Sequence, residues 1–511
     1  MRRAWDVATI RAAEKRLMAA LPEGALMQRA ASGLASVCAQ LLQGSLGQVY
    51  GSRVVLIVGS GDNGGDALFA GARLADRGAR VDALLVSDLA HAEGLAALRR
   101  AGGVAHVVVI PDDLHRMIDD ADLVLDGVVG IGGKGPLRKS AATLVRLLDA
   151  SGAVDNGPIV VAVDLPSGID ADTGDVAGAA VLADVTVTFG ALKPGLLLSP
   201  GHDHVGVLTL VDIGLADELI DANPTVCVLD ADDVASLLPH AHSGDHKYSR
   251  GVVGIVAGST QMPGAAMLAT GGARVGGVGM VRMLDHNAAV STDVVTRYPD
   301  IVLDSTVPVD ISRVNAGVCG PGLGRGDAER ELVRRILDVS TPVVLDADAL
   351  FHLHDKELRN ALLVRRDRGL VTVATPHEGE FARLIGPLGA DRVATVRGAA
   401  TDLGVIMLLK GSTTIIASPD GDTVGEAYVN IVAAPELATA GSGDVLAGLI
   451  GALLASGRDH EPLQMVAAAA YLHGLAGSRL AAGGHTFTAD KLPDAIATAM
   501  ADLRVSGRMS E

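Results

Sequence analysis

The chain of 511 residues has few cysteines, few aromatic side chains, no excess of positive charge and no long uninterrupted apolar run. Its three cysteines are odd in number and far apart (Cys38, Cys227 and Cys319). They offer neither a disulfide framework nor a CxxC metal site, and they favour a reducing compartment. Aromatic residues make up 2% of the chain and the formal net charge is −18, which argues against nucleic acid as a partner.

The sequence also predicts neither a signal peptide nor a membrane-spanning helix. The first twenty residues lack the apolar run of a signal peptide, and Ile10, Ala13 and Leu17 recur there at helical spacing. The apolar stretches at 446–454 and 466–475 are interrupted by Gly, Ser or His, so we interpret them as buried helices. We therefore expect a cytoplasmic homo-oligomer without a membrane partner.

What the chain does have is 49% hydrophobic residues and a regular alternation of short Val/Ile/Leu runs with helical segments. This alternation predicts parallel sheets covered by helices, an α/β fold. One series of predicted strands covers 54–58, 81–86, 123–125, 159–163, 185–189 and 207–211, with a helix at 66–77. A second series covers 252–257, 280–284, 317–319, 343–345, 371–374 and 405–409. The polar, proline-containing region 215–246 lies between them, so we predict two domains, 1–222 and 223–511.

In the first domain, polar residues follow three predicted strands. The glycine-rich segment 59–66 fits a dinucleotide loop only superficially, because Asp62, Asn63 and Asp66 add oxygen ligands that suit a hard cation. Asp126 and the segment 164–168 close two other strands, and the loop 130–136 offers glycines with one lysine, which suits a phosphate. Each aspartate taken alone could be a helix cap, but the set predicts one ligand-binding crevice.

These motifs resemble the NAD(P)H-hydrate epimerase domain, which has a Rossmann-like three-layer α/β/α fold. The resemblance implies that Asn63, Asp126 and Ser167 bind K⁺, and Asp164 is our candidate acid or base. Position 62 departs from the family, which usually has Asn there. The resemblance further implies that the hydrated cofactor is held by Asp62, Asn63, Gly64, Gly65, Asp66, Gly130, Ile131, Gly132, Gly133, Lys134, Gly135, Pro136 and Asp164.

The later part of the second domain contains a glycine-bracketed aspartate, Gly441-Ser442-Gly443-Asp444, that runs into an apolar helical segment. Such a turn can bind phosphate through free backbone N–H groups, although an ordinary capping turn is the alternative interpretation. Further motifs follow predicted strands at 258–266, 320–324, 345–350 and 375–380. The segment 410–414 presents a lysine, amides and three hydroxyls that would suit a nucleotide phosphate chain.

Together these segments resemble the ribokinase-like fold and, more narrowly, the ADP-dependent NAD(P)H-hydrate dehydratase. The resemblance implies Mg²⁺ and ADP, with Asp444 as the catalytic base. The region 433–436 departs from the family's Gly-Asn-Pro-Gly. The implied contacts to the hydrated cofactor are Ala266, Gly324, His377 and Asp444, and those to the nucleotide are Lys410, Gly411, Ser412, Thr413, Thr414 and Gly443.

Several residues keep a second interpretation. His377 could be an ordinary loop histidine, and Asp346 and Asp348 could be capping residues or could help to hold Mg²⁺ through water. His240, His242 and His246 lie in a predicted loop without an obvious fourth ligand, so we expect no zinc site there.

The two resemblances imply one bifunctional enzyme that repairs hydrated NADH and NADPH. The first domain would interconvert the R and S epimers at C6, as an isomerase. The second would act as a lyase, dehydrating the S epimer at the expense of ADP with AMP and phosphate as products. A ribokinase-like small-molecule kinase fused to a dinucleotide-binding domain, or a non-catalytic nucleotide sensor, are the alternatives.

Overall fold

The computed structural model describes residues 1–87, 89–107, 113–152, 157–304, 314–419 and 427–509. The chain divides into two compact units, one of residues 3–225 and one of residues 226–511 together with Met1 and Arg2. The amino group of Met1 lies 2.8 Å from Asp230 and 2.7 Å from Asp233, which form the capping box of helix α7 (Ala231–Leu237). Among the described residues no helix is long and apolar enough to cross a membrane.

The N-terminal unit contains a fully parallel sheet, as the alternation predicts. Its described strands run in the order β4-β3-β2-β5-β6-β7-β8. Their bounds are Arg53–Val58 (β2), Arg80–Leu85 (β3), Val104–Val107 (β4), Leu123–Gly127 (β5), Ile159–Val163 (β6), Val185–Phe189 (β7) and Val207–Val211 (β8). The helices are α1 (Val7–Ala20), α2 (Ala25–Leu46), α3 (Asp62–Ala75), α4 (Ala92–Arg100), α5 (Asp113–Asp119) and α6 (Lys139–Gly152).

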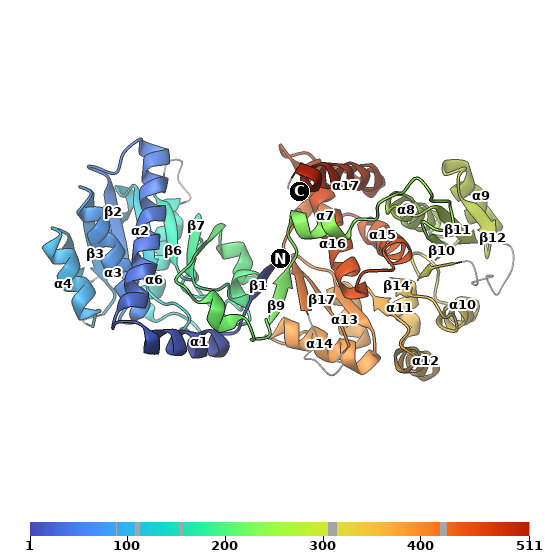
Figure 1. The fold of residues 1–511 in the computed structure, drawn as a ribbon, viewed down its shortest axis with the longest axis horizontal. Helices are drawn as coiled ribbons and strands as arrows, with labels where there is room; N and C mark the ends of the chain where they lie inside the picture. The colour runs from blue at the N-terminus through green and yellow to red at the C-terminus, as the bar shows by residue number, and fades with distance from the viewer. Residues whose placement is uncertain (88, 108–112, 153–156, 305–313, 420–426, 510–511) are drawn as a thin grey trace. The chain divides into compact units, whose positions relative to one another are not determined.

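Alternate residues of β2 belong to two different hydrophobic cores. Val54, Leu56 and Val58 pack in a cluster with residues of α1 to α4, whereas Val55 and Ile57 pack with residues of α5 and α6. Because successive side chains of a strand point to opposite faces, helices cover both faces of this sheet (Figure 1). The predicted three-layer α/β/α arrangement is confirmed.

The C-terminal unit is built on a mixed sheet with the described strand order β1-β9-β18-β17-β16-β15-β14-β13-β10-β11-β12. Strands β10 to β16 pair in parallel, but β17 is antiparallel to both β16 and β18. The strands are Arg2–Ala4 (β1), Val226–Val228 (β9), Val252–Val256 (β10), Met280–Leu284 (β11), Val302–Asp304 (β12), Ala316–Cys319 (β13), Val343–Leu345 (β14), Thr372–Ala374 (β15), Ile406–Leu409 (β16), Thr414–Ala417 (β17) and Ala427–Asn430 (β18).

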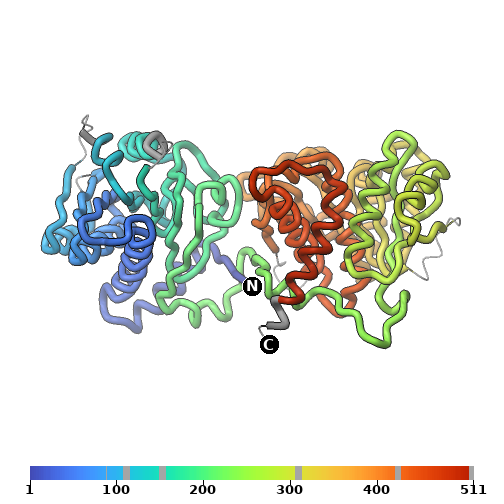
Figure 2. The backbone as a smooth tube through the Cα atoms, turned by 90° about the horizontal axis from the view of Figure 1, so that it is seen from above, coloured from blue at the N-terminus to red at the C-terminus, as the bar shows by residue number. Residues whose placement is uncertain are grey.

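Helices surround the sheet of this unit. The last two helices, α16 (Pro462–Ala481) and α17 (Leu492–Met509), pack against each other and are coloured red in Figure 2. The two predicted apolar stretches are the buried helices α15 and α16. Besides α7, the α-helices are Pro263–Val275 (α8), Ala288–Arg297 (α9), Asp327–Leu337 (α10), Asp348–His352 (α11), Lys356–Asp367 (α12), Glu378–Leu384 (α13), Arg392–Leu403 (α14), Ser442–Ser456 (α15), Pro462–Ala481 (α16) and Leu492–Met509 (α17).

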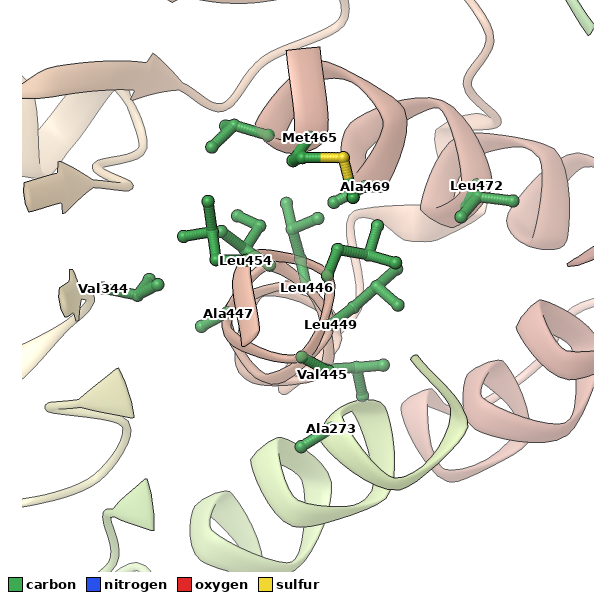
Figure 3. Packing of buried hydrophobic residues seen from close by; sticks show 14 of the residues in the cluster. Ala273, Val344, Val445, Leu446, Ala447, Leu449, Leu454, Met465, Ala469 and Leu472 are labelled. Atoms are coloured by element: carbon green, nitrogen blue, oxygen red, sulfur yellow. The ribbon is translucent and has the colours of Figure 1, made fainter. Parts of the chain in front are cut away.

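Helix α15 forms the centre of the C-terminal core. Its Val445 lies on the side of α8, near Ala273, and its Leu446 lies on the side of α16 (Figure 3). Its Ala447 faces Val344 of the sheet. Between α8 and α15 the backbones approach closely, because a Cβ atom at Gly448 would lie only 1.9 Å from the carbonyl oxygen of Ala269. This contact holds the start of α15 in a fixed place relative to α8.

We expect Gly448→Ala to destabilise the C-terminal unit, since the clashing atom belongs to a backbone that cannot rotate away. Overpacking of this kind costs on the order of 1–3 kcal/mol, measurable as a lower urea midpoint. Gly398→Ala in α14 is the matched control, because a Cβ atom there meets nothing within 4 Å. Alanine should be neutral or stabilising at that helical position. Equal effects of the two substitutions would contradict the proposed close approach.

Two candidate active sites

A cavity of about 690 Å³ opens in the N-terminal unit at the carboxyl ends of its strands. Its walls include residues of the segments that follow β2, β5 and β6, whereas the predicted site residues Asp126 and Ser167 are not among the residues that line it. All seven residues of the loop from Gly130 to Pro136 line this cavity, as do Asp62, Asn63, Asp66 and Asp164.

The segment after β2 is helical earlier than predicted. Helix α3 begins at Asp62, so positions 62–66 form its first turns instead of a loop before a helix at 66–77. Gly64 is packed against backbone, since a Cβ atom at this position would lie only 2.2 Å from the carbonyl oxygen of Gly59, and a Cβ atom on Gly65 would press on His91. These two glycines let the turn close, and neither lines the cavity.

Asp164 is held in a strained and strongly paired arrangement. Its φ of 66° is in the left-handed region, which non-glycine residues rarely adopt. The Oδ1 atom of Asp164 accepts hydrogen bonds from the Lys193 ammonium at 2.5 Å, the Thr188 hydroxyl at 3.1 Å and the Phe189 amide at 3.3 Å. Lys193 is 2% exposed. Such a buried ion pair at a cavity wall identifies Asp164 as a functional candidate.

Sequence reasoning missed Lys193. The signal was a lysine four residues beyond the fully buried strand β7, which also carries the buried Thr186 and Thr188. A charged side chain this close to a buried strand needs a counter-charge, and Asp164 on the neighbouring strand end provides it.

Behind the cavity wall, the predicted cation ligands lie together. The Asp126 carboxylate, within β5 and fully buried, accepts hydrogen bonds from the Ser167 hydroxyl at 2.7 Å and the Ser167 amide at 2.7 Å. Burial raises the pKa of Asp126 to about 6, and the Ser167 hydrogen bonds oppose the rise. No described basic side chain forms an ion pair with it.

Asn63 faces the same region, since a Cβ atom at Gly130 would lie 3.0 Å from its Oδ1 atom. The Asn63 Nδ2 atom is buried without a hydrogen-bond partner. Rotating the side-chain amide of Asn63 by 180° would exchange its nitrogen and oxygen, so that the oxygen would occupy the buried position of Nδ2. The two orientations are distinguished only by their hydrogen bonds. The orphaned amide, the buried carboxylate and the Ser167 hydroxyl are a donor set that fits a hard monovalent or divalent cation.

In the C-terminal unit, Asp444 lies in the first turn of α15, shortly after Gly441 with φ of 88°. Burial raises the pKa of Asp444 to about 7, with Asp346, Glu380 and Asp348 adding to the rise and Lys410 opposing it. The side chain of Lys410 lies over the turn, because a Cβ atom at Gly443 would come within 3.1 Å of its Nζ atom. Glycine at position 443 therefore leaves room for this lysine.

Lys410 forms an ion pair with Asp346, which follows the neighbouring strand β14. Its Nζ atom donates to Asp346 Oδ1 at 2.8 Å, and the Thr375 hydroxyl donates to the same oxygen at 2.7 Å. Burial lowers the pKa of Lys410, but Asp346 and Glu380 outweigh it, so the net shift is upward. Asp346 is therefore the ion-pair partner of Lys410, and its interpretation as a helix-capping residue is wrong.

Gly324 is fixed from both sides. Its amide donates to Asp348 Oδ2 at 3.0 Å, and its carbonyl oxygen lies 3.1 Å from His352 Nε2. Asp348 is also paired with Arg325 at 2.7 Å. Ala266 is fully buried in α8. A Cβ atom added at Gly258 would lie 2.7 Å from the Cβ atom of Ala266. The structure thus presents Gly324 as a rigid backbone group and leaves Ala266 beneath the surface.

His377 is the N-cap of α13. Its Nδ1 atom accepts from the amides of Gly379 at 3.0 Å and Glu380 at 3.3 Å, while Glu380 accepts from the His377 amide at 2.9 Å. The ring is therefore a capping group, and a β-bridge from His377 to Lys410 places it beside the lysine. The cap uses Nδ1, and Nε2 lies 3.6 Å from Glu380 Oε1.

Beyond Lys410, the remaining predicted nucleotide contacts differ in exposure. Gly411 and Ser412 are exposed, Thr413 is buried and Thr414 begins β17. The departing segment 433–436 leads into a short 3₁₀ helix, Pro435–Leu437, whose Leu437 carbonyl accepts from the Ser442 hydroxyl at 2.7 Å. Among the described residues, no group of three His, Cys, Asp or Glu side chains is placed so that it could hold a metal ion. His240, His242 and His246 are described residues and form no such group.

A second residue that sequence reasoning missed is His473 of α16. It is buried, and its Nε2 atom lies 3.0 Å from the carbonyl oxygen of Ser442, within the turn that precedes Asp444. Burial lowers the pKa of His473 to about 4, so the ring is neutral and donates to this carbonyl. The turn is held by a buried histidine as well as by α8.

Comparison with known proteins places both units. The family model described as NAD(P)H-hydrate dehydratase matches residues 253–498, and the model of the YjeF-related protein N-terminus matches residues 23–195. The bifunctional NAD(P)H-hydrate repair enzyme Nnr of Mycobacterium tuberculosis is 45% identical over 463 residues, which cover 89% of this chain and 90% of that protein. The protein of the same name from Gloeobacter violaceus is 36% identical over 489 residues, covering 91% of this chain and 90% of the relative.

Among solved structures, an ADP/ATP-dependent NAD(P)H-hydrate dehydratase from Bacillus subtilis, co-crystallised with ATP and Mg²⁺, is 28% identical to this chain. It covers 54% of this chain and 99% of its own length with a TM-score of 0.46. The identity to the full-length relatives, over nine-tenths of both chains, decides the assignment: this chain belongs to the family of bifunctional NAD(P)H-hydrate repair enzymes.

Proposed function

We propose that this chain repairs hydrated NADH and NADPH with two active sites, an epimerase in residues 1–222 and an ADP-dependent dehydratase in residues 223–511. The observation that carries the proposal is the partly buried Asp444 in the first turn of α15, after the glycine turn and close to Lys410. A carboxyl group with a pKa near neutrality is suited to accept a proton at neutral pH.

In the dehydratase, Asp444 accepts the proton of the C6 hydroxyl while that oxygen attacks the terminal phosphorus of ADP, and AMP leaves. The phosphate then departs from C6 as the ring nitrogen supplies its electron pair, and loss of the C5 proton forms the C5–C6 double bond. The backbone amides of Gly443 and Asp444 at the start of α15 and the Lys410 ammonium stabilise charge on the transferring phosphoryl group.

Mg²⁺ would neutralise the donor phosphates when bound. The described residues offer no cluster of three metal-binding side chains, and Asp346 and Asp348 already have basic partners. Such a site fits an ion held mainly by nucleotide phosphates and water, which is how Mg²⁺ is commonly bound. K⁺ in the N-terminal unit would be held by Asn63, Asp126 and Ser167 and would orient the adjoining loop from Gly130.

In the epimerase, the hydroxyl at C6 leaves and returns on the opposite face. The ring nitrogen pushes the C6–O electrons out, water adds to the resulting iminium carbon, and Asp164 exchanges the proton. Lys193 keeps the Asp164 carboxylate in place, and the loop from Gly130 to Pro136, with Lys134, binds the phosphates of the dinucleotide.

The dehydration rate should rise with pH through about 7. Asp444 must be deprotonated to accept the hydroxyl proton, and its pKa is raised to about 7 mainly by burial. Below that pH the rate should fall about tenfold per pH unit. The measurement is kcat/KM for the S epimer between pH 5 and 9, and a flat profile across pH 6 to 8 would contradict the role of Asp444.

One incubation tests the proposed function against its alternatives. Purified protein is mixed with hydrated NADH, ADP and Mg²⁺, and the absorbance of reduced nicotinamide is followed together with AMP and phosphate. Recovery of absorbance with equal amounts of AMP supports repair. A stable phosphorylated product would indicate a small-molecule kinase, and binding without turnover would indicate a sensor.

A further inference from the structure

Helix α1 forms one wall of the epimerase cavity. Asp6 caps the helix by accepting from the Thr9 amide at 2.7 Å, and Ile10 and Ala13 are buried in the core of the N-terminal unit. Arg11, Glu14 and Met18 line the cavity, and their spacing of three and four residues puts them on one face of the helix. The motifs that indicated the epimerase site did not include this helix.

Glu14 is the acidic residue of that face. Its side chain is half-buried and lines the same cavity as Asp164. Burial raises the pKa of Glu14, with Lys193 opposing the rise and Asp164 adding to it. Arg11 and Asp62 make smaller contributions in opposite directions. The described structure records no ion pair or hydrogen bond of the Glu14 side chain. A half-buried carboxyl group on a cavity wall, close to an existing ion pair, has no evident role in stability.

The reaction needs two proton-transfer groups. Hydroxide is a poor leaving group, so its departure from C6 calls for an acid on the face that it leaves. Water that adds from the opposite face calls for a base there. Asp164 alone, with three hydrogen bonds on its Oδ1 atom, can serve only one face of the ring. Two carboxyl groups flanking a reacting carbon solve the same problem in glycoside hydrolysis.

Other carboxyl groups of the cavity are less suitable. Asp66 has its Oδ1 atom buried without a partner, so this oxygen has no contact with cavity water. Asp62 is exposed and therefore fully solvated. Glu14 and Asp66 are both partly buried and both line the cavity, but neither carboxyl oxygen of Glu14 is buried without a partner. Glu14 also lies on α1, whereas Asp164 follows β6.

We propose that Glu14 is the second catalytic acid/base of the epimerase and works with Asp164. This inference rests on the proposed function of the N-terminal unit. The protonated Glu14 carboxyl donates its proton to the C6 hydroxyl, the C6–O bond breaks, water leaves and the nitrogen electron pair forms the N1–C6 double bond. Water then adds to the other face of C6, its proton passes to the Asp164 carboxylate, and the electron pair returns to nitrogen. The reverse reaction exchanges the two roles.

The test uses the full chain and a mixture of both epimers of hydrated NADH with ADP and Mg²⁺. The S epimer is consumed in a fast phase, and the R epimer in a slow phase limited by epimerisation. Glu14→Gln should slow the second phase by about 100-fold or more, because general acid–base catalysis typically contributes that much. The fast phase should be unchanged, which shows within the same sample that the dehydratase is intact.

Three further measurements make the outcome decisive. Without nucleotide, wild-type protein should introduce oxygen from isotopically labelled water into the C6 hydroxyl, and Glu14→Gln should lose this exchange. The loss should be in kcat, with KM changed by less than about threefold, and Glu14→Asp should recover part of the rate. Glu93→Gln, an exposed glutamate in the first turn of α4 and outside the cavity lining, should behave as wild type.

Failure of this inference and failure of the proposed function look different. A wild-type slow phase no faster than the reaction without protein would remove the epimerase function itself. A normal wild-type slow phase that survives in Glu14→Gln would overturn the role of Glu14 alone. A defect confined to KM, or equal inactivity of Glu14→Asp and Glu14→Gln, would also overturn it, because both indicate a binding or packing role.

Discussion

Asp444→Asn is expected to abolish ADP-dependent dehydration while epimerisation continues at the wild-type rate. The amide keeps the size of the side chain but cannot accept a proton from the C6 hydroxyl, and it also removes a negative charge from beside Lys410. Loss of the general base and of the negative charge of Asp444 should together lower kcat by about 10³-fold or more. The fall is measured as recovery of nicotinamide absorbance from the pure S epimer.

Epimerisation in this variant is followed by chromatographic separation of the R and S forms, which needs no nucleotide. The control is Ser442→Ala, which removes the hydroxyl that donates to the Leu437 carbonyl and leaves the carboxyl group in place. We expect it to lower the rate far less. If Asp444→Asn reduced both activities equally, the division of labour between two sites would be wrong.

The strand ends were the part of both sites that sequence could predict. Asp164 and Lys410 follow apolar runs within an alternation of strands and helices that predicts parallel strands, and the carboxyl ends of such strands meet at one edge of a sheet. The predicted bounds agree with the structure at both ends for β6, β7, β8, β11 and β14, and to within one residue for β2, β3, β10, β13, β15 and β16. Long-range partners were not predictable, because the pairs Asp164–Lys193 and Lys410–Asp346 depend on which strands become neighbours.

Short elements were missed for a related reason. Strands β17 and β18 are antiparallel and four residues long, and β9 and β12 are three residues long. Runs this short carry little periodicity of their own, so those that were found, such as β14, were found because they lie between helical segments of the alternation. The early start of α3 was missed because glycines usually indicate a loop, whereas Gly64 here is needed for close packing against Gly59.

Asp164→Asn should remove epimerisation and spare dehydration, the reverse of the Asp444 variant. Asparagine tolerates the positive φ of this position, so the backbone can keep its conformation. The amide cannot exchange the proton, and we expect at least about a 100-fold loss in the rate of R to S conversion. The measurement is the slow phase of repair of a mixture of epimers, with the fast phase as the internal reference.

Stability must be separated from chemistry in this variant, because Asp164→Asn leaves the Lys193 ammonium buried without its counter-charge. Breaking a buried ion pair on one side costs about 3–5 kcal/mol, so the N-terminal unit should unfold at lower urea concentration. Adding Lys193→Met removes the unpaired charge and should restore most of that stability without restoring epimerisation. Recovery of activity along with stability would show that Asp164 serves the fold and not the reaction. Stability recovered with activity still absent would instead assign Asp164 to proton transfer, with Lys193 as the group that holds its carboxylate in place.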